Sequence, residues 1–240
     1  RFAFQAVILL PIVAATRRPW RMDRATAGFV ALRTALHVAG IATMFTALLY
    51  LPLADAIAIA YVMPFVALLL GHWQLGEESG WRRIAACAAG FAGTLLVIQP
   101  AFETVGWPAL LPLAVAVIFA LFMLVTRRIA RQTDAIAMQA VSSLMALAVL
   151  VPVLALAPRG LPALDWQPMA PGTWWLAAAM GVTGTLAHLL MVWSLRFAPA
   201  STLAPMQYVE IPIATAVGFV IFGDLPGPMA ALGIAITIAS

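Results

Sequence analysis

A single carboxylate, Glu210, lies near the middle of an otherwise apolar stretch, close to Gln207 and Tyr208. A charged side chain in hydrocarbon is costly unless it faces a cavity or a partner. Loss of water disfavours the ionised carboxylate, which suits proton binding or recognition of an amino group. The alternative is a structural pair with a cationic or hydroxyl neighbour. We therefore predict that Glu210, Gln207 and Tyr208 contribute to a substrate-binding site.

Arg33 and His37 form a second candidate group in another apolar stretch. They are four positions apart, so they share one face of a helix. Facing a cavity, the Arg33 guanidinium could bind a substrate carboxylate. Lying near the helix end, Arg33 could instead extend its charge to the interface. His37 could bind substrate or serve as a hydrogen-bonded packing residue.

Two aromatic residues, Tyr61 and Trp193, complete the predicted site. Tyr61 comes just before Pro64 and could offer a ring or a hydroxyl to a cavity. Trp193 could line the cavity or anchor its helix at the membrane interface. His188, on the same stretch as Trp193, is expected to be structural.

The sequence offers little for catalysis, cofactor binding or metal binding. The three histidines, His37, His72 and His188, lie on different stretches without ligand spacing, and there is no phosphate-binding loop. We therefore predict no metal, no cofactor and no enzymatic activity, and expect any driving energy to come from an ion gradient or from exchange.

The composition places these residues in a membrane. Of 240 residues, 64% are hydrophobic and 9% are charged, against about 25% charged in soluble domains. The apolar runs have helix length, which indicates an all-α polytopic membrane protein. The net charge of +4 does not indicate nucleic-acid binding, because the arginines cluster in short loops between apolar runs. The predicted membrane segments are residues 2–15, 27–51, 54–73, 81–98, 107–125, 136–157, 174–195, 200–222 and a short run from 228.

The arginines alternate between the predicted loops. Loops after odd-numbered segments hold ten arginines and loops after even-numbered segments hold one, Arg159. Positively charged loops face the cytoplasm, so the odd-numbered loops are predicted to be cytoplasmic. The ten are Arg17, Arg18, Arg21, Arg24, Arg82, Arg83, Arg127, Arg128, Arg131 and Arg196.

One unit of sequence occurs twice. Leu75-Gly76-Glu77 aligns with Phe222-Gly223-Asp224, which pairs Met63 with Glu210. Five predicted crossings separate the copies, so they have opposite orientations. Such inverted repeats recur in secondary transporters, which hold substrate near the midplane.

The repeated stretches resemble a known family. ALLYLPLADAIAIAYVMPFVALLLGHWQLGE (residues 47–77) and APASTLAPMQYVEIPIATAVGFVIFGDLPGP (residues 198–228) resemble the EamA modules of the drug/metabolite transporter superfamily. The resemblance implies a bacterial inner-membrane transporter of ten helices in two five-helix modules, residues 1–100 and 101–240. It also implies that the first helix is absent and the last is truncated, and that segments two, three, seven and eight line the cavity.

Together these features predict a secondary transporter whose partners are the lipid bilayer and a small metabolite. Export of an amino acid or related compound, with proton coupling or exchange, is the first expectation. Uptake of a vitamin or nucleotide-like compound, such as riboflavin or S-adenosylmethionine, is the alternative. A membrane scaffold or an intramembrane enzyme is the alternative from another class. The expected assembly is a monomer or homodimer.

Overall fold

The computed structural model describes residues 1–51, 53–75, 80–82, 84–85, 87–89, 92, 106–156, 170–210, 213, 216 and 220. In these ranges every regular element is helical, as the composition predicts. The α-helices are α1 (Phe2–Ala15), α2 (Arg24–Ala47), α3 (Leu53–Ala60), α4 (Met63–Leu75), α7 (Leu110–Ala130), α8 (Ala135–Leu156), α9 (Trp174–Phe197) and α10 (Ala200–Leu203). The 3-10 helices are η1 (Trp107–Ala109), η2 (Pro171–Thr173) and η3 (Pro205–Val209).

Helices α2, α7, α8 and α9 are each long and apolar enough to cross a membrane. A crossing needs about 20 residues, and these helices have 24, 21, 22 and 24. The prediction of a multi-pass, all-α membrane protein is therefore confirmed. The ten-helix inverted repeat and the modules 1–100 and 101–240 stay predictions, since both Gly-acid ends and most of segment 81–98 lie outside the described residues.

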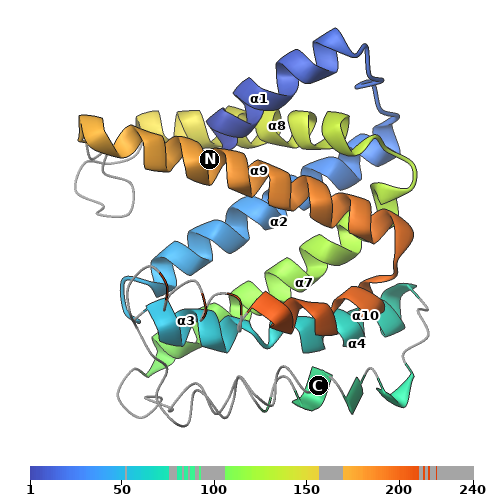
Figure 1. Ribbon diagram of the computed structural model, residues 1–240, viewed down its shortest axis with the longest axis vertical. Coiled ribbons are helices and arrows are strands. Elements are labelled where there is room, and N and C mark those ends of the chain that lie inside the picture. Colours follow the sequence, from blue (N-terminus) through green and yellow to red (C-terminus); the bar gives the residue numbers. More distant parts are fainter. Residues whose placement is uncertain are drawn as a thin grey trace. The chain divides into compact units, whose positions relative to one another are not determined.

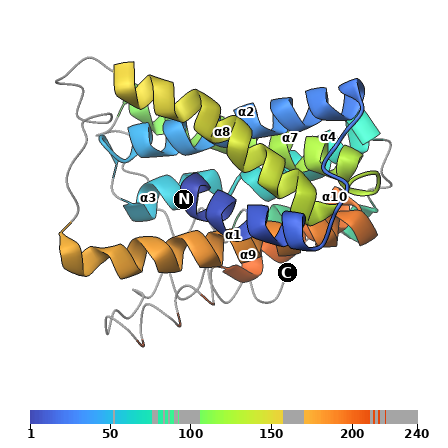
Figure 2. The same cartoon turned by 90° about the horizontal axis from the view of Figure 1, so that it is seen from above.

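The chain divides into two compact units. Unit 1 comprises Arg1–Val38 and Val125–Phe197, and unit 2 comprises Ala39–Leu124 and Ala198–Ser240. In unit 1, α1 packs against α8 and α9 (Figure 1). Figure 2 shows the same three helices together from above. The approach of α1 to α9 is close because Gly181 has no side chain; a Cβ there would overlap with Phe4.

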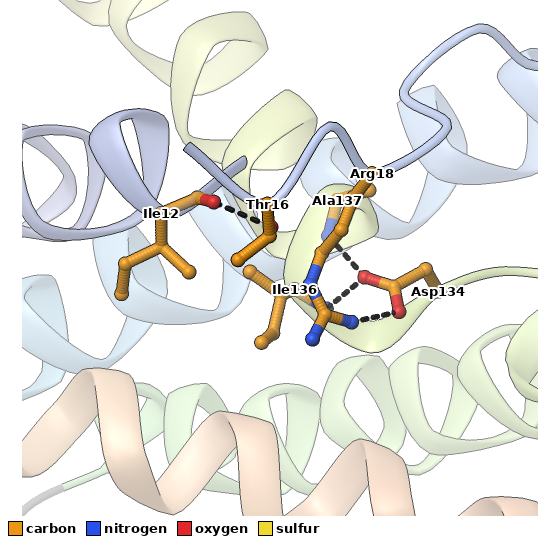
Figure 3. Close-up of polar contacts among 6 residues, drawn as sticks. All are labelled: Ile12, Thr16, Arg18, Asp134, Ile136 and Ala137. Carbon is orange, nitrogen blue, oxygen red and sulfur yellow. Dashed lines mark hydrogen bonds and ion pairs between the residues drawn. The ribbon is translucent and has the colours of Figure 1, made fainter. Parts of the chain in front are cut away.

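In unit 1, an ion pair joins the loop after α1 to the start of α8. Asp134 directly precedes α8. Its Oδ1 accepts hydrogen bonds from the N–H groups of Ile136 and Ala137, at 3.1 and 3.0 Å. Its Oδ2 pairs with the guanidinium of Arg18, which follows α1 (Figure 3). A carboxylate at a helix N-terminus satisfies backbone donors and favours the helix dipole. One aspartate thus caps α8 and links it to the end of α1.

In unit 2, both copies of the repeated sequence are interrupted as helices. The sequence predicts one continuous helix over residues 54–73, but the structure has α3 and α4 separated by a turn at Tyr61 and Val62. Pro64 is compatible with the first turn of α4, because backbone N–H groups in the first turn of a helix have no partner within the helix. The predicted helix 200–222 likewise begins as the short α10 and continues as η3, which opens with Pro205. Both α10 and η3 pack against α4.

Candidate functional site

Four of the predicted site residues lie in unit 2, at the interruptions of its helices. We call Tyr61, Gln207, Tyr208 and Glu210 the tyrosine–glutamate site. Tyr61 lies in the turn between α3 and α4, Gln207 and Tyr208 lie in η3, and Glu210 follows directly. Backbone interruptions therefore position all four side chains.

The two tyrosine rings of this site are stacked. Their centroids are 6.3 Å apart and their planes differ by 28°. Glu210 lies within electrostatic range of the Tyr61 hydroxyl. Glu210 is exposed, whereas Tyr208 is 1% exposed. The site thus presents a carboxylate beside an aromatic pair.

The Gln207 amide makes a second link within unit 2. Its Nε2 donates to the sulfur of Met123 on α7, at 3.0 Å. A thioether is a weak hydrogen-bond acceptor, so this contact orients the Gln207 amide through a weak hydrogen bond. Cys87 is buried and lies within electrostatic range of Tyr208.

Arg33 belongs to a different arrangement, in unit 1. It is fully buried, and its Nε, Nη1 and Nη2 donate to Thr126 Oγ1, Ser142 Oγ and Gln139 Oε1 at 2.9, 2.8 and 2.6 Å. We call these four residues the arginine network. It joins α2 to α7 and α8, and Gln5 extends it to α1 by donating to the backbone oxygen of Gln139 at 3.0 Å.

His37 lies one helical turn from Arg33 and packs among aromatic rings. Its ring centroid is 4.5 Å from that of His188 on α9 and 5.2 Å from that of Phe2 on α1. His37 is 3% exposed. The imidazole pair therefore joins α2 to α9 within unit 1.

Trp193 lies on α9 and is 40% exposed. It belongs to neither of these groups. This exposure is compatible with either predicted role, a cavity aromatic or an interface anchor.

Sequence reasoning missed the partners of Arg33. Thr126, Gln139 and Ser142 are polar residues within long apolar helices. Polar side chains in membrane segments usually face other helices. That placement was the available signal, but only the fold shows that the three converge on Arg33.

The long apolar helices and the buried polar groups define a multi-pass membrane protein with interrupted helices at a polar site. The model of the EamA-like transporter family matches residues 1–99 and 106–240. The chain belongs to this family, as the repeated stretches predict.

Several relatives are named as transporters. The chain is 26% identical over 242 residues to a riboflavin transporter of Vibrio cholerae, covering 100% of this chain and 78% of that protein. It is 27% identical to a riboflavin transporter of Rhizobium johnstonii, covering 94% and 70%. It is 25% identical to an S-adenosylmethionine uptake transporter of Rickettsia bellii, covering 94% and 75%.

The fold also matches a solved crystal structure. The TM-score is 0.74 at 20% identity, covering 99% of this chain and 82% of the other. This likeness concerns the fold alone. Family membership and the named relatives support a transporter of a small molecule rather than an enzyme.

Proposed function

We propose that the protein is a secondary active transporter that carries a small metabolite across the bacterial inner membrane through the tyrosine–glutamate site. The observation that carries the proposal is the stacking of Tyr61 and Tyr208 next to Glu210 at interrupted helices. Transporters of inverted-repeat architecture bind substrate where membrane helices are discontinuous. An intramembrane carboxylate marks a substrate or proton path.

The site favours a planar nitrogen-containing substrate. Stacked aromatic side chains bind flat rings, and a carboxylate accepts hydrogen bonds from ring or amino N–H groups. The relatives named above carry riboflavin and S-adenosylmethionine, and both molecules contain a nitrogen heterocycle. Uptake of a vitamin or nucleotide-like compound is therefore the first candidate.

Export of an amino acid is the second candidate. Glu210 could bind a substrate ammonium group, since opposite charges attract strongly in a low dielectric. In either case Glu210 could exchange a proton with the solvent, which would couple transport to a pH gradient. We expect the protein to act as a monomer or homodimer.

The test is flux in proteoliposomes. The full-length protein is reconstituted, and uptake and release of labelled riboflavin, S-adenosylmethionine and amino acids are measured with and without a pH gradient. We expect flux of one of these substrates, and we expect Glu210→Gln to lower it at least about tenfold, the effect of losing one charged interaction of roughly 1.4 kcal/mol.

The matched control neutralises a carboxylate outside the site. Asp23 precedes α2 in an arginine-rich loop, so Asp23→Asn should transport like the wild type. Absence of flux with every substrate would favour a scaffold or an enzyme and overturn the proposal. Wild-type flux in Glu210→Gln would remove Glu210 from the site.

A further inference from the structure

Tyr61 and Tyr208 occupy equivalent positions in the repeated sequence. The offset that pairs Leu75-Gly76-Glu77 with Phe222-Gly223-Asp224 also pairs Tyr61 with Tyr208, and one inserted residue precedes them where Ala54-Asp55 pairs with Ala200-Ser201. The two residues lie at equivalent interruptions, one between α3 and α4 and the other in η3. In unit 2 their rings stack.

The contact between the equivalent residues Tyr61 and Tyr208 locates the site relative to the repeated sequence. Two copies related by a two-fold axis bring equivalent residues into contact only close to that axis. In inverted-repeat transporters the axis lies in the membrane plane, and substrate binds near it at the repeat interface. The Tyr61–Tyr208 pair therefore marks the centre of the predicted repeat.

The two tyrosine hydroxyls differ in their surroundings. The Tyr61 hydroxyl lies within electrostatic range of Glu210, which stands where the first copy has Met63. The Tyr208 hydroxyl is buried, and within the described part of the chain it has no hydrogen-bond partner. A buried hydroxyl without a partner destabilises the protein. Such groups persist where a functional role compensates for the lost stability.

We propose that Tyr208 is a specificity-determining residue whose hydroxyl donates a hydrogen bond to an acceptor on the substrate. The inference rests on the proposed function and names its substrate class. The Glu210 carboxylate supplies acceptors, and the Tyr208 hydroxyl supplies a donor. Together they fit a flat nitrogen heterocycle that carries an N–H group and a carbonyl or ring nitrogen along one edge.

The change Tyr208→Phe separates this role from a structural one. This change removes the hydroxyl and keeps the ring, so the protein no longer buries a hydroxyl that has no partner among the described residues. We expect a higher Tm in detergent and, at the same time, a Kd for the heterocycle raised by about three- to tenfold, the value of one hydrogen bond. A structural hydroxyl would lower Tm when removed.

Two matched variants complete the series. Tyr61→Phe removes a hydroxyl that lies within electrostatic range of Glu210, so it should not raise Tm. Tyr50→Phe changes the one remaining tyrosine of the chain, which is 53% exposed, and should change neither Tm nor Kd. Comparing the three variants distinguishes the effect of the Tyr208 hydroxyl from that of any phenol-to-phenyl change.

The binding probes are riboflavin and adenosine, measured by ligand fluorescence and by calorimetry with the full-length protein. A third probe, 3-methylriboflavin, has its ring N–H blocked and should bind more weakly than riboflavin. Equal Kd values in wild type and Tyr208→Phe would overturn the role of Tyr208 while leaving transport intact. Binding of neither heterocycle would also overturn it. If amino acid flux through Glu210 persisted in that case, the proposed transport function would stand.

Discussion

The arginine network and the tyrosine–glutamate site are both polar groups among apolar helices, but they differ in the backbone that carries them. Arg33 donates three hydrogen bonds from the interior of a continuous helix to residues on two other continuous helices. The tyrosine–glutamate site lies at helix interruptions and includes the Tyr208 hydroxyl, for which no partner exists among the described residues. Gln139 Nε2 in the arginine network likewise has no partner among the described residues. The first arrangement therefore joins continuous helices, whereas the second lies where helices are interrupted.

This difference refines how polar residues in membrane helices are interpreted. Intramembrane charge is by default a sign of function, and that default selects Arg33 and Glu210 alike. Interhelical hydrogen bonds also stabilise membrane bundles. Local backbone irregularity distinguishes the two cases here, and it leads us to propose Glu210 rather than Arg33 as the substrate contact.

The largest expected effect follows from Arg33→Ala. Three interhelical hydrogen bonds are lost, each worth about 0.6–1.7 kcal/mol in a membrane protein, so we expect a loss of roughly 2–5 kcal/mol. Arg33→Lys keeps the charge but not the forked geometry and should lose a smaller part of this stability. The measurement is thermal unfolding in detergent, with substrate binding determined on the folded fraction.

The comparison predicts that the folded fraction of Arg33→Ala binds substrate like the wild type. A variant with wild-type Tm and lost binding would instead place Arg33 in the substrate site. The distinction between the two groups would then fail.

A smaller effect is expected at two glycines, one in each unit, that lie close to the side chain of a neighbouring helix. A Cβ at Gly181 would overlap the Cβ of Phe4, which cannot move without its backbone. A Cβ at Gly40 would lie 2.8 Å from Cε2 of Phe119, the far end of a flexible side chain. We expect Gly181→Ala to cost about 1–3 kcal/mol, as overpacking does, and Gly40→Ala to cost less. Equal losses of Tm would show that α1 can shift away from α9.

Hydropathy predicted the continuous helices well. Segments 2–15, 136–157 and 174–195 correspond to α1, α8 and α9 within two residues at each end, whereas segments 27–51 and 107–125 differ from α2 and α7 by three to five residues at each end. The interruptions at Tyr61 and at η3 were missed because hydropathy averages over a window and does not register backbone geometry. Pro64 and Pro205 were visible signals of those interruptions.

The candidate site was predicted in part. Glu210, Gln207, Tyr208 and Tyr61 were selected from residue type, and the structure brings these four together in unit 2. Arg33 and His37 were grouped with them, since spacing along a helix indicates a shared face but not the partners across it. Which helices face Arg33 depends on tertiary packing, and this information is not available from periodicity.

The smallest expected effect separates the pH dependence of folding from that of transport. Asp23 precedes α2, and its Oδ2 accepts hydrogen bonds from the N–H groups of Ala25 and Thr26, at 3.2 and 3.3 Å. A hydrogen bond with the Thr26 side chain, together with these backbone contacts, holds the pKa of Asp23 below its ordinary value. Stability from a lowered carboxyl pKa is complete above the unfolded-state pKa, near about 4, and is lost as pH falls through the folded-state pKa.

The range from pH 5 to 8 begins about one unit above the unfolded-state pKa. Asp23 should therefore contribute no pH dependence to the stability in this range. Asn caps helices as well as Asp does but does not titrate. Asp23→Asn should keep the neutral-pH Tm and lose part of the acid sensitivity below about pH 4. Flux between pH 5 and 8 should follow the same profile in Asp23→Asn and in the wild type. If Asp23→Asn flattened that profile, the pH dependence would belong to the loop before α2 rather than to Glu210.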